Sequence, residues 1–276
     1  MIVCKPNAKI NLGLNIVARR DDGYHNIETT MCPIKLCDKL QIEEDDHTSL
    51  EIKGLSIAGN IEDNLIIKVV RYMQQQFGVP QLQVMLTKNI PMGAGLGGGS
   101  SDAAFTLSQI NKLFNLKLNN DNLAKIAALF GSDCAFFINN SPAIASGRGD
   151  ILRPANISLY DYHVIVISPD IYISTAEAYA GCHPDPWATP LEKVLEQPID
   201  TWRTDLRNDF EPQAFSAHPE LAEIKQMLYN IGATYASMSG SGSSMYGIFS
   251  QLPTLEAIDK ALSTILSGIK YSVFAD

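Results

Sequence analysis

The stretch of sequence that decides the fold is PMGAGLGGGSSDAA, residues 91–104. Five of its first nine residues are glycines, and two serines and an aspartate follow them. Glycine leaves backbone N–H groups uncovered and adopts the positive φ angles of an anion-binding nest. We therefore predict that a helix begins here, that Ser100, Ser101 or Asp102 caps it, and that a phosphate binds at its N-terminus. The alternative interpretation is a tight turn followed by an ordinary helix cap.

The same stretch contains the pattern GxGxxG, but the surrounding sequence excludes three well-known phosphate-binding loops. A dinucleotide-binding fold requires an acidic residue after a further strand, whereas Asp121 lies in a predicted helix. A P-loop requires a lysine after its last glycine, and Gly99 is followed by Ser100. The protein-kinase loop is accompanied by VAIK, HRD and DFG elements, none of which occurs in this chain. The phosphate-binding interpretation therefore rests on the glycines themselves.

The composition is that of a globular protein with one large domain or two ordinary ones. The chain has 276 residues, of which 46% are hydrophobic and 18% charged. Its formal net charge of −9 argues against a nucleic-acid partner, which requires a basic surface, but it is compatible with a small anionic ligand held by local donors. The five cysteines include no CxxC pair, so we expect reduced thiols.

Neither a secretion signal nor a membrane segment is indicated. The first residues, MIVCKPNAKINLGL, lack the apolar core of a signal peptide, and no run approaches the roughly 18 apolar residues of a membrane span. We therefore predict a cytoplasmic protein with no membrane partner. The sequence leaves the oligomeric state open.

Alternation and helical spacing divide the chain into short strands and helices. Apolar residues alternate over residues 10–16, which predicts a strand with Lys9 and Asn11 on its opposite face. Further strands are predicted at residues 39–44, 49–55, 81–88, 162–168 and 270–276, and twice within 234–250. Helices are predicted at residues 63–77, from 100 onward, and at 121–131, 174–181, 218–232 and 254–266. The change of rhythm after Pro154 predicts a boundary between two α+β units near residues 152–160.

Three motifs resemble the GHMP kinase superfamily, which includes galactokinase, homoserine kinase, mevalonate kinase and phosphomevalonate kinase. The glycine stretch resembles its phosphate-binding motif, KPNAKINLGL (residues 5–14) its N-terminal strand, and SMSGSGSSMYGIF (residues 237–249) its C-terminal glycine loop. The resemblance covers nearly the whole chain. It implies an α+β, two-domain fold, with a ribosomal protein S5 domain 2-like N-terminal domain over residues 1–155 and a ferredoxin-like C-terminal domain over residues 156–276.

Three further segments resemble one branch of this superfamily, whose substrate is a methylerythritol joined to cytidine diphosphate. They are AKINLGLNIVARRDDGYHNIETTM, GSDCAFF and LRNDFE, at residues 8–31, 131–137 and 206–211. The resemblance implies an ATP-dependent kinase that phosphorylates the 2-hydroxyl of the erythritol in non-mevalonate isoprenoid biosynthesis. Two alternatives stay open: another small-molecule kinase of the superfamily, against which the GYH turn argues, or a nucleotide-binding regulator that has lost catalysis.

The resemblance assigns the chemistry to Lys9 and Asp133. Asp133 matches the family's catalytic aspartate, which can accept the hydroxyl proton, and Lys9 matches its catalytic lysine. A lysine beside this carboxylate keeps it ionised and stabilises developing negative charge. Without the resemblance, Asp133 would be interpreted as a helix cap and Lys9 as a solvated strand residue. The relative roles of the two in activating the hydroxyl are left open.

For the cytidine group, the resemblance implies recognition by Tyr24, His25 and Tyr179. Tyr24 and Tyr179 are expected to enclose the pyrimidine ring, and His25 to read its hydrogen-bonding edge. Simple packing of these rings is the alternative. Further substrate contacts are expected at Asn11, Thr175, Gly240, Ser241 and Gly242.

The resemblance also implies an ATP site. Its expected residues are Pro91, Met92, Gly93, Ala94, Gly95, Leu96, Gly97, Gly98, Gly99, Ser100, Ser101, Asn64 and Lys88. Asn64 and Lys88 are expected near the adenine, with a helix cap and a solvated lysine as the alternatives. Mg²⁺ is expected to arrive with ATP, and its protein ligands are left open, although Asp102 is an acidic residue within the motif. Asp209, in LRNDFE, receives no role beyond capping a helix.

Overall fold

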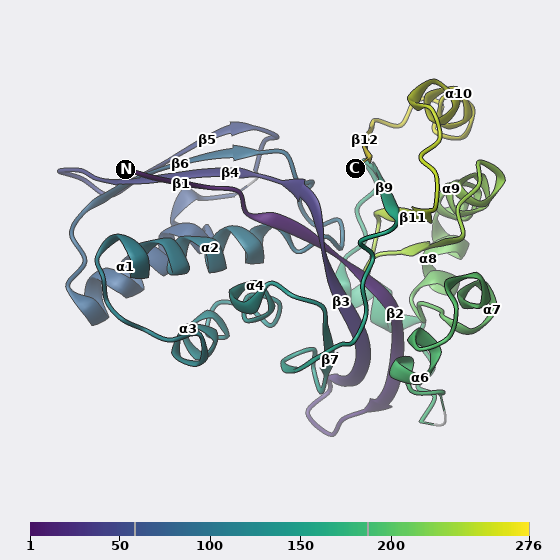
Figure 1. Ribbon diagram of the computed structural model, residues 1–276, viewed down its shortest axis with the longest axis horizontal. Helices are drawn as coiled ribbons and strands as arrows, with labels where there is room; N and C mark the ends of the chain where they lie inside the picture. The colour runs from purple at the N-terminus through teal and green to yellow at the C-terminus, as the bar shows by residue number, and fades with distance from the viewer. Residues whose placement is uncertain (58, 187, 276) are drawn as a thin grey trace. The chain divides into compact units, whose positions relative to one another are not determined.

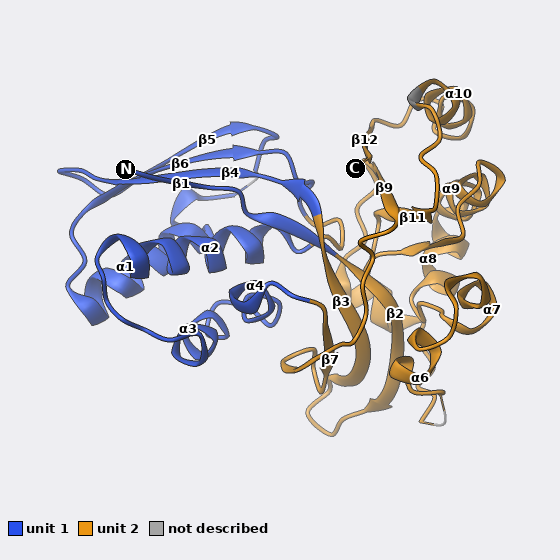
Figure 2. Cartoon of the chain, viewed as in Figure 1, with its two compact units in different colours: residues 1–9, 35–92, 97–141 blue, residues 10–34, 93–96, 142–276 orange. Residues whose placement is uncertain are grey.

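The structure is a computed structural model that describes residues 1–57, 59–186 and 188–275, and the chain divides into two compact units (Figure 2). Unit 1 consists of residues 1–9, 35–92 and 97–141, and unit 2 consists of residues 10–34, 93–96 and 142–276. The predicted domains divide the chain differently, because most of two long strands and part of the glycine stretch belong to unit 2. The domain boundary at 155/156 therefore stays a prediction.

Unit 1 contains a four-stranded sheet in the order β1-β4-β6-β5 (Figure 1). β1 pairs antiparallel with β4 and β4 antiparallel with β6, whereas β5 pairs parallel with β6. The strands are Ile2–Cys4 (β1), Lys39–Glu44 (β4), Ser49–Gly54 (β5) and Leu82–Lys88 (β6). Along β6, fully buried residues alternate with half-buried ones, so one face of this strand supplies the core.

Two long helices lie along one face of this sheet (Figure 1). α1 (Leu65–Phe77) and α2 (Gly98–Leu113) share an apolar core with the strands, to which residues such as Val70 and Leu107 contribute. α1 ends at Phe77, as the sequence predicted, and is followed by Gly78, whose φ of 66° is a left-handed C-cap. The shorter helices of the unit are η1 (Ile61–Asp63), α3 (Asn120–Ala127) and α4 (Phe136–Asn139).

Unit 2 contains a sheet of order β2-β3-β7-β8 and a second sheet of order β10-β11-β9-β12. In the second sheet every neighbouring pair is antiparallel. The strands are Asn7–Arg19 (β2), His25–Cys37 (β3), Ala143–Ser146 (β7), Ile151–Pro154 (β8), His163–Pro169 (β9), Tyr235–Met238 (β10), Met245–Phe249 (β11) and Tyr271–Ala275 (β12). Residues 7–9 of β2 and 35–37 of β3 belong to unit 1.

The helices of unit 2 follow the amphipathic patterns of the sequence. α9 (Pro219–Asn230) contacts β10 and β11 and buries Leu221, Ile224 and Leu228 in the core. The remaining helices are Thr175–Ala180 (α5), Leu191–Leu195 (α6), Ile199–Thr201 (η2), Trp202–Asp205 (α7), Glu211–Ala217 (α8) and Leu255–Ile265 (α10). Among the described residues, no helix combines the length and the apolar character needed to cross a membrane.

Candidate active site

Lys9 and Asp133 form an ion pair in unit 1. Lys9 lies on β2, and its Nζ is 3.5 Å from Oδ2 of Asp133. The lysine side chain is 4% exposed, whereas that of Asp133 is 31% exposed. Burial lowers the pKa of Lys9, and the Asp133 carboxylate opposes this shift. The pair therefore presents a reachable carboxylate backed by a buried amine, and the interpretation of Lys9 as a solvated strand residue is wrong.

The backbone of the glycine stretch packs directly against this lysine. A Cβ added to Gly97 would lie 3.2 Å from Cε of Lys9 and 3.0 Å from Cζ of Phe137. Gly97 also has a φ of 70°, a left-handed conformation that glycine adopts without strain. The conformation therefore favours glycine at this position, and a side chain here would press on Lys9 and Phe137.

The second half of the glycine stretch, residues 97–101, forms the start of α2. The helix begins at Gly98 with Gly97 as its N-cap, and no side chain caps it. The predicted side-chain cap is therefore wrong, because the left-handed Gly97 starts the helix before the polar residues are reached. The backbone N–H groups of the first turn thus have no side-chain partner, which suits an anion. The residues predicted as caps lie inside the helix instead: Ser100, Ser101 and Asp102.

A pocket of about 340 Å³ lies beside this helix, within unit 1. Gly99 and Asp102 of α2 line it together with Asn64 and Met92. Oδ1 of Asn64 also caps α1 by accepting the backbone N–H of Ile66 at 2.9 Å, so its side chain is held in place. The size and lining are those of a small-molecule site. The apolar side chains of the pocket are Ile52, Ile57, Ile61 and Leu65.

Lys88 is fully buried rather than solvated. Its ammonium donates hydrogen bonds to Oδ2 of Asp38 and, at 2.7 Å, to Oδ2 of Asp102. Oδ1 of Asp38 in turn accepts the backbone N–H groups of Asn89 and Ile90. Lys88 therefore holds two carboxylates inside unit 1, and its predicted place near the adenine stays a prediction. The sequence did not reveal this because the two aspartates lie far from Lys88 along the chain.

The first half of the glycine stretch, residues 93–96, belongs to unit 2 and packs against the C-terminal glycine loop. The hydroxyl of Ser239 donates to the carbonyl oxygen of Gly95 at 2.8 Å. The backbone N–H of Ser244 donates to the carbonyl oxygen of Ala94 at 3.2 Å. A Cβ added to Gly95 would overlap the carbonyl oxygen of Ser239. Gly95 therefore has a packing reason to be glycine, and its predicted phosphate contact stays a prediction.

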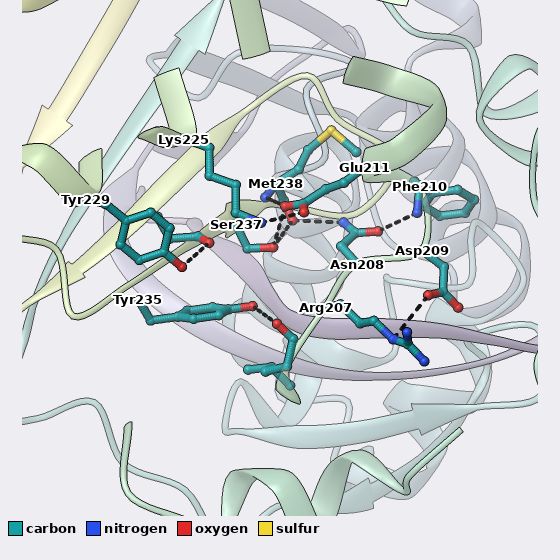
Figure 3. A network of polar contacts seen from close by, with 12 residues as sticks. Arg207, Asn208, Asp209, Phe210, Glu211, Lys225, Tyr229, Tyr235, Ser237 and Met238 are labelled. Carbon is teal, nitrogen blue, oxygen red and sulfur yellow. Dashed lines mark hydrogen bonds and ion pairs between the residues drawn. The ribbon is translucent and has the colours of Figure 1, made fainter. Parts of the chain in front are cut away.

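Asn208 and Glu211 fix the strand and loop that make this contact (Figure 3). Nδ2 of Asn208 donates to the carbonyl oxygens of Met238 at 2.9 Å and Gly240 at 2.8 Å. Oε1 of Glu211 accepts the backbone N–H of Met238 and the hydroxyl of Ser237, both at 2.9 Å. Both side chains belong to buried residues. The LRNDFE segment thus supports the C-terminal glycine loop, a role that the sequence analysis missed.

Asp209 binds strand β2 within unit 2. Its Oδ2 accepts the backbone N–H of Ile16 at 2.8 Å, and its own N–H donates to the carbonyl oxygen of Leu14 at 2.9 Å. Burial raises the pKa of Asp209, and the hydrogen bond from Ile16 opposes this shift. Arg207 lies 4.0 Å from its other carboxylate oxygen (Figure 3). Asp209 therefore joins LRNDFE to β2 and does not cap α8, whose N-cap is Phe210 with no side-chain hydrogen bond, so the predicted cap is wrong.

The aromatic residues predicted for cytidine recognition lie in unit 2. His25 stacks on Tyr179, with ring centroids 4.8 Å apart and planes at 13°. Tyr24 is 57% exposed, and the guanidinium of Arg148 lies 4.7 Å from the centroid of its ring. The structure therefore holds His25 against Tyr179 and pairs Tyr24 with a cation that the sequence analysis did not single out. Enclosure of a pyrimidine by Tyr24 and Tyr179 stays a prediction.

Asn11 is buried and belongs to the hydrogen-bond network of unit 2. Its Nδ2 donates to Oγ1 of Thr29 at 3.0 Å, and its backbone N–H donates to Oγ of Ser239 at 3.3 Å. Its backbone carbonyl accepts the hydroxyl of Tyr246 at 2.8 Å. Asn11 thus helps to hold the C-terminal glycine loop. Its predicted contact with substrate, and the predicted strand face shared with Lys9, stay predictions.

The C-terminal glycine loop connects β10 to β11. Gly240 and Gly242 have φ angles of 57° and 90°, so both positions favour glycine. Thr175 is exposed at the first position of α5, directly after the capping residue Ser174. The substrate contacts predicted for these residues and for Ser241 stay predictions.

Comparison with known protein families defines the class. The sequence profile of the GHMP kinases N terminal domain matches residues 64–143, and that of the GHMP kinases C terminal region matches residues 191–267. The first match contains the glycine stretch, α2 and Asp133, and the second contains LRNDFE and the C-terminal glycine loop. The fold and these matches together define a GHMP kinase.

Curated relatives narrow this class. A 4-diphosphocytidyl-2-C-methyl-D-erythritol kinase of Bacteroides thetaiotaomicron is 48% identical over 258 residues, covering 92% of this chain and 94% of the relative. A kinase of the same name from Cytophaga hutchinsonii is 42% identical over 265 residues, covering 96% and 97%. The chain therefore belongs to the 4-diphosphocytidyl-2-C-methyl-D-erythritol kinase family.

Solved structures agree with this family. A crystal structure of 4-(cytidine 5'-diphospho)-2C-methyl-D-erythritol kinase matches with a TM-score of 0.81 at 28% identity, covering 99% of this chain and 98% of that one. The crystal structure of L. major mevalonate kinase in complex with R-mevalonate matches with a TM-score of 0.69 at 15% identity, covering 99% and 95%, and shares the fold alone. The predicted α+β, two-domain GHMP kinase fold is confirmed.

Proposed function

We propose that this chain transfers the terminal phosphoryl group of ATP to the 2-hydroxyl of 4-(cytidine 5'-diphospho)-2-C-methyl-D-erythritol, giving the 2-phosphate and ADP in non-mevalonate isoprenoid biosynthesis. Membership of the family supports this pair of substrates. The observation that carries the chemistry is the Lys9–Asp133 ion pair packed against Gly97, at the start of α2. We expect a cytoplasmic location and no nucleic-acid or membrane partner, in keeping with the net charge of −9.

Asp133 is the proton acceptor in this proposal. As the substrate hydroxyl attacks the γ-phosphorus, its O–H bond breaks and the proton passes to the carboxylate of Asp133. The bond from the γ-phosphorus to the bridging oxygen breaks at the same time, and ADP leaves. Lys9, buried behind the carboxylate, stabilises the negative charge that develops on the transferred group.

The start of α2 suits the phosphates of ATP. The backbone N–H groups of its first turn lack side-chain caps, and the N-terminal end of a helix attracts anions. Mg²⁺ neutralises phosphate charge when it is bound. We propose that ATP carries the ion, because Mg²⁺ keeps several waters and is usually bound through substrate phosphates with few protein ligands. The pocket lined by Asn64 and Met92 is the proposed site of the adenosine.

At the cytidine end of the substrate, we propose that the base stacks on Tyr24 and that His25 contacts its edge. The ring of Tyr24 is exposed and therefore available for stacking. The parallel stack on Tyr179 fixes the plane of His25, which directs its ring nitrogens. Arg148 restrains the ring of Tyr24 through a cation–π contact.

ADP release in the presence of ATP and Mg²⁺ tests this function. Three acceptors are offered separately: the cytidine diphosphate substrate, mevalonate and homoserine. We expect turnover with the first alone. Turnover with another acceptor would show a kinase that acts on a different substrate and would contradict the cytidine assignment. Binding of ATP without turnover of any acceptor would favour the alternative of a nucleotide-binding regulator that has lost catalysis.

The variant Asp133→Asn tests the proton acceptor. We expect a fall in kcat of roughly 10²–10⁴, the range typical of general base catalysis, with little change in the melting temperature. Asp121→Asn is the matched control, because Asp121 is an exposed aspartate at the start of α3. Wild-type kcat in Asp133→Asn would overturn the role.

A further inference from the structure

A second pocket, of about 430 Å³, lies within unit 2, where residues of α6 and α7 line it. The two helices contact each other, and Nε1 of Trp202 on α7 donates to the carbonyl oxygen of Gln197, just after α6, at 3.0 Å. The described residues that line this pocket include neither member of the Lys9–Asp133 pair and none of the rings predicted for cytidine recognition. Its volume lies within the range of small-molecule sites, so it is a candidate for a ligand outside the proposed reaction.

Asn15 brings a buried amide to this pocket. It belongs to β2, lines the pocket and is only 3% exposed. Its Nδ2 donates to the carbonyl oxygen of Thr189 at 3.2 Å, which fixes the orientation of the amide. Its Oδ1 accepts no hydrogen bond from the residues that the structure describes, and it is not among the atoms that the fold seals from solvent. A ligand in the pocket can therefore meet this oxygen with a hydroxyl or amino donor.

Two cationic side chains also line the pocket, Lys193 on α6 and Arg207 two residues after α7. Nη2 of Arg207 lies 3.5 Å from Oδ2 of Asp185, and its Nε lies 4.0 Å from Oδ1 of Asp209, so both ion pairs are long. Lys193 forms no ion pair with any residue that the structure describes. Among the described lining residues, Asp205 is the only acid. The lining therefore carries an excess of positive charge in a chain whose formal net charge is −9, which favours an anionic ligand.

The two cations and the amide together define the class of ligand. A phosphate monoester carries a charge of roughly −1.5 to −2 at pH 7, which two cations match, and an arginine guanidinium binds phosphate oxygens in pairs. A fully ionised phosphate offers acceptors only and cannot donate to Oδ1 of Asn15. A hydroxyl elsewhere on the same ligand supplies that donor.

We propose that this pocket binds a small phosphorylated polyol. Its phosphate lies between Lys193 and Arg207, and one of its hydroxyls donates to Oδ1 of Asn15. The site belongs to unit 2 alone and does not rest on the proposed function, because none of its residues takes part in the phosphoryl transfer described above.

Calorimetry with sn-glycerol 3-phosphate, on the full chain at low ionic strength, tests the proposal. Two comparison compounds each lack one of the recognised groups: glycerol has no phosphate, and inorganic phosphate has no alcohol. We expect saturable binding of one equivalent of glycerol phosphate. Each comparison compound should bind at least roughly 10-fold more weakly, as expected when a charge-assisted or buried hydrogen bond is lost.

Two charge variants of the lining should change the affinity in opposite directions. Lys193→Gln removes a cation and should weaken binding of glycerol phosphate roughly 10-fold. Asp205→Asn removes the carboxylate that repels the ligand and should strengthen binding by up to about 5-fold. Lys125→Gln is the matched control, because it removes an exposed cation from α3 in unit 1 and should leave the affinity unchanged. Damage to the fold cannot produce changes of both signs.

The near-isosteric Asn15→Leu tests the hydroxyl contact. We expect this variant to bind glycerol phosphate no more tightly than inorganic phosphate, while its melting temperature reports on folding. Equal affinity of the wild type for these two compounds would overturn the polyol class without any variant.

Three further results would overturn the site itself. One is the absence of saturable binding of glycerol phosphate to the wild type. Another is equal weakening by Lys193→Gln and Lys125→Gln, which would show an unspecific effect of net charge. The third is loss of binding in Tyr24→Ala, which would place the ligand at the proposed cytidine site instead.

Discussion

Both halves of the glycine stretch contain glycines, but the glycines of the two halves have different tasks. In residues 93–96, Gly95 is required because the backbone of Ser239 lies where its side chain would be. In residues 97–101, the glycines begin α2 beside Lys9 and lie next to the proposed adenosine pocket. One motif in the sequence therefore contains a packing contact in unit 2 and the proposed anion site in unit 1.

This difference teaches that a glycine-rich motif should not be assigned to its ligand as a whole. A glycine that approaches backbone tolerates no side chain, since neither partner can move away. A glycine that faces a flexible side chain or an open ligand site tolerates alanine better. Stability should therefore report on the first half, and nucleotide binding and turnover on the second.

Gly95→Ala is expected to have the largest effect. The new Cβ would overlap the carbonyl oxygen of Ser239, and the φ of 76° adds strain. We expect a loss of more than about 4 kcal/mol in the free energy of unfolding, measured with urea. A loss below about 1 kcal/mol would show that the contact in unit 2 is loose and would remove the contrast between the halves.

Asn208→Asp is expected to have the next largest effect on stability. The substitution keeps the shape but directs a carboxylate oxygen, in place of the donating Nδ2, at the carbonyl oxygens of Met238 and Gly240. We expect a destabilisation of about 2–3 kcal/mol in urea unfolding, because both carbonyls lose their donor. Asp205→Asn, nearby at the end of α7, is a control at an exposed position. Equal unfolding of the two variants would contradict the supporting role of Asn208.

Gly97→Ala should separate stability from turnover. A side chain at φ 70° costs about 1–2 kcal/mol, and its Cβ would press on Cε of Lys9. We expect kcat to fall by more than the stability loss explains, because the ion pair with Asp133 is displaced. The measurements are kcat at saturating substrates and the melting temperature of the same preparation. Unchanged kcat would contradict the placement of Lys9 in the chemistry.

The pH dependence of the free energy of unfolding should reveal the raised pKa of Asp102, which is buried and directly follows the second half. Its pKa is raised from 3.8 to about 8 on folding, so between these values the folded state binds more protons than the unfolded state. Its contribution to stability is therefore lost as pH rises from about 4 to 8, with a slope on the order of 1 kcal/mol per pH unit at most. Urea unfolding of the wild type and Asp102→Asn at pH 5, 6.5 and 8 measures this. Parallel curves would contradict the shift.

Gly99→Ala should have the smallest effect on stability. The nearest atom to its Cβ is Cε of Met92, a flexible side chain, at 3.7 Å. Alanine also favours the helix by up to about 1 kcal/mol, so we expect unchanged or slightly higher stability. The Michaelis constant for ATP should rise, because Gly99 lines the pocket. A destabilisation as large as that of Gly95→Ala would contradict the expected difference between the two halves.

Patterns local in the chain were predictable from the sequence. The alternation of β6, the helix ending at Gly78 and the family resemblance each depend on neighbouring residues. The start of α2 was not predicted correctly, because Ser100–Asp102 look like caps and only the left-handed Gly97 shows that the helix begins earlier. Local patterns thus predict the elements and miss their exact ends.

Contacts between segments that lie far apart in the chain could not be predicted from the sequence. The sequence suggested Lys88 as an adenine neighbour or a solvated lysine, and did not reveal its partner Asp38, which lies 50 residues away. The spacing of GYH shows that two rings are adjacent in the chain, but the structure is needed to show that His25, rather than Tyr24, stacks on Tyr179. The burial and orientation of a side chain depend on partners that lie far away in the chain, and patterns within one sequence do not reveal these partners.

The division of the chain into units has a consequence for synthesis on the ribosome. All residues of unit 1 have been made once residue 141 emerges, whereas unit 2 begins at residue 10 and ends with β12. Leu14, Ile16 and Ile27 join a core whose other members lie at residues 165–266, so they wait unburied while the second half is translated. That interval lasts on the order of 10 s at ordinary elongation rates. Translation speed and chaperone access during this wait should therefore govern the yield of folded enzyme in a recombinant host.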